Sequence, residues 1–171
     1  ILLDNASLPF IPLKKEIEFL ELYLSLEKLR IPDLQFTVEI EPEIDTNNTS
    51  VPNMMLQPYI ENAIWHGLSP KNSDKKLALR IYRQNGAVQY EIEDNGIGRK
   101  KAAALKGLYR KEHKSKGMEL LTKRFKVLRE EFGSEIKTTI DDLAETENTG
   151  GTRVIISVPF ALPWSKKEAI A

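Results

Sequence analysis

The sequence predicts a two-layer α/β (α+β) sandwich, in which helices cover one face of a mixed, largely antiparallel five-stranded sheet. Five segments alternate apolar and polar residues with the period of two that is typical of half-buried strands: 36–40, 77–81, 88–92, 136–140 and 154–158. Asn85-Gly86, between the second and third of these segments, is a strong hairpin signal. Each strand has one apolar face, so we expect helices on one side of the sheet and water on the other.

The composition is that of an ordinary globular protein and excludes several functions. The chain has 171 residues, of which 41% are hydrophobic and 29% charged, and 25 Lys+Arg balance 25 Asp+Glu. With no net charge we expect no nucleic-acid partner. The absence of cysteine excludes thiol chemistry, and two histidines argue against a His-rich zinc site. No apolar run approaches the ~20 residues of a membrane span. The chain opens at Ile1 without an initiator Met, and we expect it to be part of a longer protein.

The N-terminal part, residues 1–32, is predicted to be a lead-in followed by a linker helix from Leu13 to Arg30. Apolar residues cover more than one stripe of this helix, so it should pack against two partners at once. One is its own domain, and the other is a second subunit or an upstream segment. Residues 33–162 form the main domain in this prediction, and residues 163–171 form a tail.

Three further helices are expected. One spans about 52–66 and stops at Gly67, a suitable residue just past a helix end. Another begins near Gly117, carries apolar residues at helical spacing and is closed by Gly133. A weaker helix is expected after Gly98.

Asn62 and His66 form the first candidate site. They are four residues apart on the expected helix 52–66 and therefore share a face. An asparagine on a largely apolar helix is costly if it is buried without a partner. Asn62 either bonds to a neighbouring backbone group or presents its amide oxygen to a metal-bound phosphate, and the segment alone leaves both interpretations open.

Asp94 and Thr152 form the second candidate site. Period two places Asp94 on the buried face of the strand 88–92, and a buried carboxylate requires donors. Gly96 and Gly98 permit a sharp turn and the close approach of a ligand, although a plain turn is the alternative. The hydroxyl of Thr152 also points inward. Two buried polar groups at strand ends suggest one shared ligand, and an adenine amino group would be a fitting donor.

The third candidate site is the basic segment 99–117. It holds eight lysines and arginines against one glutamate, and it ends at Ser115-Lys116-Gly117, where a helix is expected to begin. The free amides and the dipole of a helix N-terminus attract anions. A solvated basic loop is the alternative, but the position between two glycine turns favours a phosphate.

The order of these motifs resembles the GHKL ATP-binding superfamily. Within it, 51–58 with Leu-Gln-Pro, together with 61–67, is similar to the N box of sensor histidine kinases of the LytS-like branch. The helix 13–30 resembles the helix that precedes the N box there. The resemblance covers nearly all of the chain, and four motifs in order are more specific than any one of them.

The resemblance implies roles at the adenine end of the site. Asp94 matches the aspartate that bonds the adenine amino group, and Thr152 matches a residue that assists it through water. Gly96 and Gly98 match the glycines of the G1 box. Each of these positions carries the residue type that the family pattern requires.

The resemblance also implies a phosphate end. Asn62 matches the asparagine that coordinates Mg²⁺ on the ATP phosphates, with His66 on the same face, and Gly117 matches the G2 glycine. The segment of about 99–116 matches the mobile ATP lid. Here the sequence departs from the family: Ser115-Lys116-Gly117 replaces Gly-x-Gly, and Trp65 stands where many histidine kinases have a lysine. Lys114 or Lys116 would have to supply that charge.

The resemblance implies the catalytic, ATP-binding part of a two-component sensor histidine kinase. It would bind Mg·ATP and donate the γ-phosphate to a histidine elsewhere, because neither His66 nor His113 matches the acceptor motif. The expected parent is a membrane-anchored dimer with this domain in the cytoplasm, coupled to a LytTR-type response regulator. One alternative is a GHKL-fold interaction module that has lost nucleotide binding. Another is an ATPase switch, against which Pro58 argues because it occupies the place of the hydrolytic glutamate.

Overall fold

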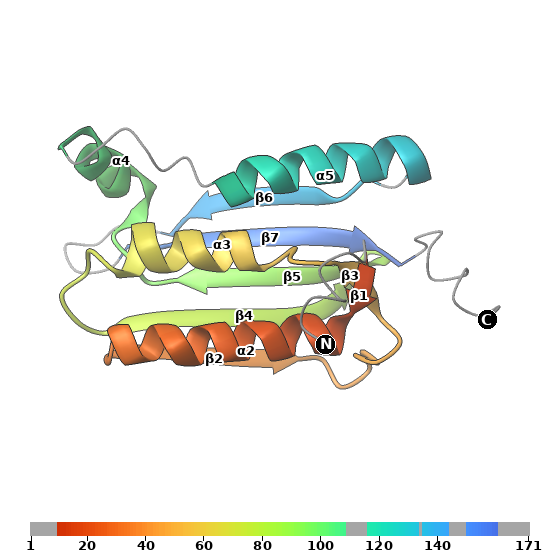
Figure 1. Ribbon diagram of the computed structural model, residues 1–171, viewed down its shortest axis with the longest axis horizontal. Coiled ribbons are helices and arrows are strands. Elements are labelled where there is room, and N and C mark those ends of the chain that lie inside the picture. The colour runs from red at the N-terminus through yellow and green to blue at the C-terminus, as the bar shows by residue number, and fades with distance from the viewer. Residues whose placement is uncertain (1–9, 109–115, 134, 144–149, 161–171) are drawn as a thin grey trace.

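This computed structural model describes residues 10–108, 116–133, 135–143 and 150–160. Within these ranges the sheet has the strand order β2-β4-β5-β7-β6. Its strands are β2 (Leu34–Ile40), β4 (Lys75–Gln84), β5 (Ala87–Asp94), β7 (Thr152–Pro159) and β6 (Lys137–Asp142). Only β2 and β4 pair in parallel, and the other neighbours are antiparallel. The predicted five-stranded, largely antiparallel sheet is therefore confirmed (Figure 1).

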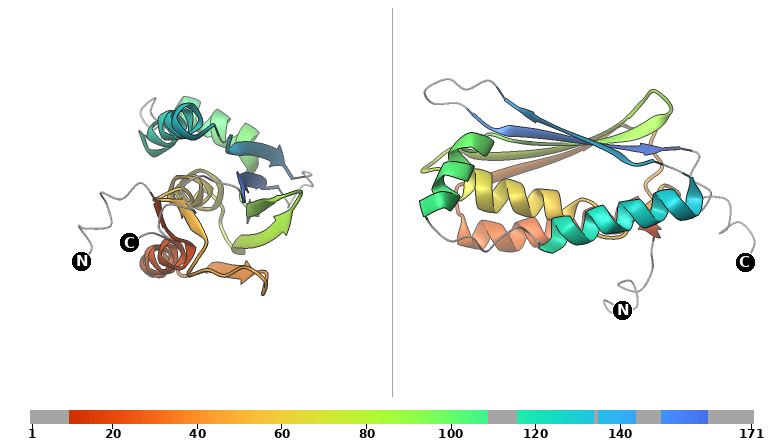
Figure 2. Two further views of the ribbon diagram at one scale, coloured as in Figure 1. Left: turned by 90° about the vertical axis from the view of Figure 1, so that its right-hand side faces the viewer. Right: turned by 90° about the horizontal axis from the view of Figure 1, so that it is seen from above.

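Helices cover one face of this sheet, as expected. The helices are α2 (Leu13–Arg30), α3 (Gln57–Asn62), α4 (Gly98–Leu108) and α5 (Lys116–Phe132). Figure 2 shows α2, α3 and α5 lying side by side along the same face, with α4 at one end of the layer. The core between the layers is apolar, and α3 is at its centre, with Ile60 and Ile64 almost inaccessible to water. Within the described ranges, no helix combines the length and the apolar character needed to cross a bilayer.

The linker helix has the predicted bounds, and only one of its faces is covered. Ile17, Leu20 and Leu24 are buried against the domain. Leu22, Leu26 and Leu29, spaced as a second stripe, are 57%, 56% and 80% exposed. The predicted packing on the domain is confirmed, and the second stripe faces solvent in the described chain.

Two details of the N-terminal half differ from the sequence predictions. The lead-in forms a short strand, β1 (Phe10–Pro12), that pairs antiparallel with β3 (Ser50–Pro52). The helix expected to begin at Pro52 instead begins at Gln57, because Pro52 pairs with Phe10 and Met54 has a left-handed φ of 57°. Pro58 then takes a place in the first turn, where its missing N–H costs nothing.

Gly67 does not end the helix, contrary to the expectation. α3 passes into a π-helix, η1 (Ala63–Leu68), that contains Gly67. The N–H of Ser69 donates to the carbonyl of Ile64, which is an i→i+5 bond of 2.7 Å. π-Segments of this kind are often found at functional sites.

The turns and helices of the second half agree with the sequence. Asn85 and Gly86 have φ values of 53° and 74°, and this primed turn joins β4 to β5 as a hairpin. The weak helix after Gly98 is α4, and α5 is followed by Gly133 with φ 66°. Strand β6 is the exception to the expected apolar faces, because all its residues are exposed at the edge of the sheet.

Candidate functional site

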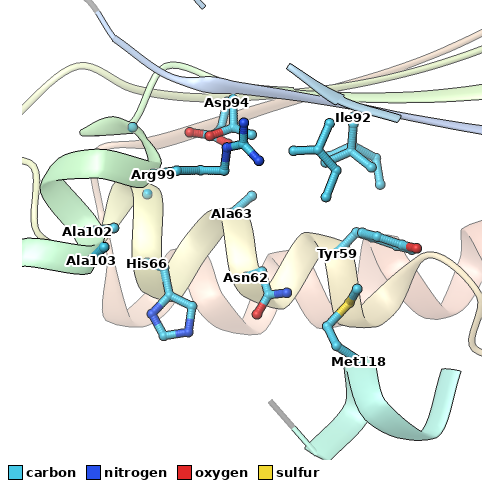
Figure 3. A pocket seen from close by; sticks show the side chains of 15 residues that line it. Tyr59, Asn62, Ala63, His66, Ile92, Asp94, Arg99, Ala102, Ala103 and Met118 are labelled. Atoms are coloured by element: carbon cyan, nitrogen blue, oxygen red, sulfur yellow. The ribbon is translucent and has the colours of Figure 1, made fainter. Parts of the chain in front are cut away.

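A cavity of about 410 Å³ lies between one end of the sheet and the helices α3, η1, α4 and α5 (Figure 3). Its size is in the range of small-molecule sites. Its walls are mainly apolar and come from the strands through Ile92 and Val154, and from α5 through Met118. Of the predicted site residues, Asn62, His66, Asp94, Gly98 and Thr152 all line this one cavity. The structure thus brings together three motifs that are far apart in the sequence.

Asp94 is the buried polar group of the site, as its position in the strand pattern predicted. It is the last residue of β5 and 4% exposed. Its Oδ1 accepts the N–H of Gly96 at 2.8 Å, and its carboxylate also accepts the backbone N–H of Thr152. Burial raises the pKa of Asp94 to about 6, against the opposing effect of these two donors. The two N–H donors therefore hold the Asp94 carboxylate in place as a hydrogen-bond acceptor in a mainly apolar cavity wall.

Three glycines allow the backbone to close tightly around Asp94. A Cβ on Gly96 would lie 2.3 Å from the carbonyl carbon of Gly67, and a Cβ on Gly67 would lie 2.7 Å from Asp94 Oδ1. Gly151, with φ 143°, would place a Cβ 2.0 Å from the carbonyl oxygen of Asp94. From the sequence, Gly96 is expected to admit a ligand, whereas in the structure it faces the backbone of Gly67, and the contacts of Gly67 and Gly151 were not predicted. Only the fold reveals them, because the neighbours come from other segments.

Gly67→Ala should therefore disturb the cavity around Asp94, and not only the helical segment that contains residue 67. The added methyl must displace the Asp94 carboxylate, and we expect adenosine affinity to fall by about tenfold or more, which corresponds to about 1.4 kcal/mol. Calorimetry with adenosine measures this. Ser69→Ala, at an exposed position at the end of η1, is the matched control and should bind normally. Unchanged adenosine affinity in Gly67→Ala would contradict the expectation that Asp94 contacts an adenine base.

Asn62 and His66 are on the opposite side of the cavity from the sheet. Asn62 ends α3 and His66 follows in η1, and Figure 3 shows both side chains projecting on the side of Met118, away from Asp94. Among the described residues no cluster of three His, Cys, Asp or Glu side chains could hold a metal ion. Asn62 fits a Mg²⁺ ion that takes most of its ligands from phosphates and water, because Mg²⁺ usually binds through only one or two protein oxygens.

The basic segment contributes the start of a helix to the site. Lys116 and Gly117 are the first residues of α5, and Met118 lines the cavity beside them. The N-terminus of this 17-residue helix therefore lies beside the cavity, where the helix dipole would favour an anion. Lys114 and Ser115 lie outside the described residues, and so does most of the expected lid beyond α4.

Arg99 is a site residue that sequence reasoning did not single out. It lies in the first turn of α4 and lines the cavity. Its Nε donates to Asp142 Oδ1 at 2.7 Å and its Nη2 to Oδ2 at 3.0 Å. Asp142 is the register partner of Thr152, which is itself opposite Asp94. In the sequence Arg99 is one of a run of basic residues, and only its ion pair with Asp142 of β6 distinguishes it from its neighbours.

Two aromatic residues, Tyr59 of α3 and Trp65 of η1, have different roles. Tyr59 lines the cavity, is 6% exposed, and its hydroxyl lies 3.2 Å from Thr138 Oγ1 on β6. Trp65 lies outside the set of described residues that line the cavity and is 42% exposed. The guanidinium of Arg30 lies over its ring, 4.6 Å from the centroid. The tryptophan that replaces the family lysine therefore faces α2 and does not fill the site.

Comparison with known proteins finds sequence relatives over most of the chain. No protein-family model matches the chain. Sensor histidine kinase BtsS of Escherichia coli K12 is 32% identical over 154 residues, which are 88% of this chain and 24% of BtsS. Sensor protein LytS of Bacillus cereus is 33% identical over 96 residues, or 56% of this chain and 16% of LytS. LytS of Oceanobacillus iheyensis is 34% identical over 122 residues, or 69% of this chain and 21% of that protein.

The chain is related to the LytS-type sensor histidine kinases. It spans only 16–24% of the length of these relatives. Two solved structures share its fold at low sequence identity. The mycobacterial sensor histidine kinase MprB has a TM-score of 0.52 at 14% identity, over 88% of this chain and 97% of that one. The catalytic domain of the histidine kinase ThkA has a TM-score of 0.50 at 15% identity, over 88% and 93%.

The fold is therefore that of histidine kinase catalytic domains, as the resemblance implied. The sequence relatives are sensor kinases over much of the chain, which favours an ATP-binding catalytic domain over an interaction module that has lost its nucleotide. The cavity supports the same preference. Of the two departures that prompted the alternative, Trp65 is not among the described residues that line the cavity, and Ser115 lies outside the described residues.

Proposed function

We propose that this cavity binds Mg·ATP and that the chain is the catalytic part of a sensor histidine kinase, donating the γ-phosphate to a histidine outside it. One observation carries the proposal: a buried carboxylate, Asp94, lies at one side of a cavity whose other side presents the amide of Asn62. An adenine ring offers an amino donor to the first group. A Mg²⁺-bearing triphosphate suits the second.

At the adenine end, Asp94 would accept a hydrogen bond from the exocyclic amine. Its two backbone donors, Gly96 and Thr152, hold the carboxylate in place so that little reorganisation is needed on binding. The Thr152 hydroxyl would assist through water. Ile92 and Val154 supply the apolar walls for the ring.

At the phosphate end, Asn62 would give its amide oxygen to Mg²⁺, and His66 beside it would contact the phosphates. When bound, the ion neutralises phosphate charge and orients the triphosphate. The N–H groups at the start of α5, including that of Gly117, and the cation of Lys116 would hold phosphate oxygens. We propose the same role for Lys114 and Ser115, and a covering role for the lid of about 99–116.

The site favours transfer over hydrolysis. Of the described residues that line the cavity, Asp94 alone is a carboxylate, and it belongs to the adenine end. Pro58, in the first turn of α3, takes the place from which a glutamate would activate water. The chain's residues would therefore position the nucleotide and neutralise its charge, and the nucleophile would come from the acceptor histidine.

The wider assembly is proposed from the relatives. Sensor kinases of this kind imply a phosphoacceptor region in the parent and a response regulator, here of the LytTR type, as partners. We further propose a homodimeric, membrane-anchored parent that carries this domain in the cytoplasm. The exposed stripe of Leu22, Leu26 and Leu29 on α2 supports a further packing partner for that helix.

ATP should bind with clear preference over GTP. Guanine presents a carbonyl where adenine presents an amine, so the Asp94 carboxylate would face an acceptor and both would be unpaired. We expect about 1–3 kcal/mol, or about one to two decades of affinity, in favour of ATP. Calorimetry with both nucleotides in the presence of Mg²⁺ tests this. Equal affinities would contradict the assignment of Asp94, and no binding of either would contradict the proposed function.

A further inference from the structure

Glu16 is a buried carboxylate that the proposed chemistry does not use. It lies on the inner face of α2, is 2% exposed, and is well separated in the chain from every cavity residue. Its Oε2 accepts the N–H of Met54 and its Oε1 accepts the N–H of Leu56, both at 3.0 Å, and the N–H of Met55 also bonds to it. Three consecutive backbone donors thus converge on one side chain.

These donors belong to the turn that starts α3. Leu56 is the N-terminal cap residue of α3, and it makes no side-chain capping hydrogen bond. Met54 holds a left-handed φ of 57°, which is unusual for a residue with a long side chain. A carboxylate at a helix start satisfies the free N–H groups and interacts favourably with the helix dipole. Glu16 therefore anchors to α2 the turn that leads into α3, including the N–H of the cap residue Leu56.

The same junction reaches two more elements. Arg124 of α5 donates through Nη1 to the carbonyl of Asn53, which is 4% exposed and immediately precedes Met54. The positive charge of Arg124 acts on Glu16, and burial raises the pKa of Tyr90 on β5, with a further contribution from the negative charge of Glu16. α2, α5 and the strand that ends at Asp94 therefore meet at the start of α3.

We propose that Glu16 is a positioning residue for the phosphate end of the site: it fixes the start of α3 against α2 and so fixes where Asn62 stands. α3 has six residues, and Asn62 is the last of them. A rigid segment this short carries a displacement at its start directly to its end. The Asp94 carboxylate is held separately, by the N–H groups of Gly96 and Thr152 at the end of the sheet. The inference rests on the proposed function of Asn62.

The test separates the two ends of the site. Affinities for adenosine, and for ATP with and without Mg²⁺, are measured in the full chain for the wild type, Glu16→Ala, Glu16→Gln and Arg124→Met. The matched control is Glu18→Gln, on the same helix, where an exposed carboxylate pairs with Lys15 Nζ at 3.0 Å. We expect Glu16→Ala to lower the Mg²⁺-dependent gain in ATP affinity by about tenfold, with adenosine affinity nearly unchanged.

The conservative variant Glu16→Gln should show a Mg²⁺-dependent gain in ATP affinity between those of the wild type and Glu16→Ala. Glu16→Gln keeps one accepting oxygen and should restore part of the gain lost in Glu16→Ala. Arg124→Met removes the donor to Asn53 while keeping an alkyl chain, and it should reproduce the loss in milder form. This second variant decides the matter if the Glu16 variants do not fold.

Two results would overturn the inference. One is an unchanged Mg²⁺-dependent gain in folded Glu16 or Arg124 variants. The other is a parallel fall of adenosine and Mg·ATP affinity, which would mean that Glu16 supports only the fold. Failure of the wild type to bind adenosine or Mg·ATP would instead overturn the proposed function, and the inference with it.

Discussion

Asp94→Asn is expected to abolish most nucleotide affinity while making the nucleotide-free domain more stable. The amide keeps an oxygen for the N–H of Gly96 but presents an NH₂ group where adenine also presents one. The unpaired contact costs about 1–3 kcal/mol, or about one to two decades of affinity. Calorimetry with adenosine measures this loss.

The gain in stability follows from the pKa. Burial raises the pKa of Asp94 from 3.8 to about 6, so the fold prefers the neutral acid. The contribution of the Asp94 carboxyl to the free energy of unfolding is fully present below pH 3.8 and is lost as the pH rises through about 6. At neutral pH the ionised group then costs about 3 kcal/mol, since one pKa unit is about 1.4 kcal/mol. A neutral amide avoids most of this cost.

Thermal unfolding at pH 7.5 checks the prediction, and Tm should rise by several degrees, since about 1 kcal/mol corresponds to about 2–4 °C in a domain of this size. Asp141→Asn, at an exposed position on β6, is the control and should change neither quantity. The difference in Tm should vanish at pH 4, where the wild-type carboxyl is neutral. Unchanged adenosine affinity in Asp94→Asn would contradict the proposed contact between Asp94 and the adenine base.

Asn62→Ala is expected to abolish phosphoryl transfer while leaving the fold intact. Asn62 is partly exposed in the cavity wall, so its truncation leaves no void in the core. If Asn62 holds Mg²⁺ as proposed, loss of its amide oxygen would misplace the triphosphate, and several kcal/mol of charge stabilisation correspond to a loss of about 100-fold or more. The measurement is radiolabelling of the parent's acceptor region, added in trans or present in the intact kinase.

The isolated chain itself should take up no phosphate. His66 shares the side of the cavity with Asn62 and so lies within the proposed metal and phosphate region, not beyond the γ-phosphate. In-line transfer needs a nucleophile about 3–3.5 Å from phosphorus and opposite the leaving oxygen. Acid-labile phosphate on the isolated chain, lost in His66→Ala or His113→Ala, would contradict its role as a donor domain without its acceptor.

Much of the architecture could be predicted because local patterns decide it. Period two placed Asp94 on the buried face of its strand, and helical spacing with Pro12 and Arg30 bounded the first helix as the structure has it. These patterns depend on neighbours in the sequence. The order of the motifs then indicated the family, and the structure brings five of the predicted site residues to one cavity: Asn62, His66, Asp94, Gly98 and Thr152.

What the sequence did not reveal depends on contacts between distant segments. Gly67 resembles a helix terminator, but its missing Cβ makes room for Asp94, and the helix continues around it as a π-segment. Glu16 resembles one more surface charge on a helix, because the donors that bury it come up to 40 residues later. Arg99 is one of several basic residues in a row, and the sequence does not show that this one pairs with Asp142.

The contact between Arg30 and Trp65 gives the molecule a built-in optical probe. Trp65 is on η1 beside the cavity residue His66, and its ring faces the C-terminal end of α2 through Arg30 and a hydrogen bond with Tyr23. Its indole fluorescence should respond both to occupation of the neighbouring site and to any shift of α2. The chain's other tryptophan is Trp164, so Trp164→Phe leaves a single tryptophan. Emission spectra of that variant would then follow the α2–η1 contact in solution, with no attached dye.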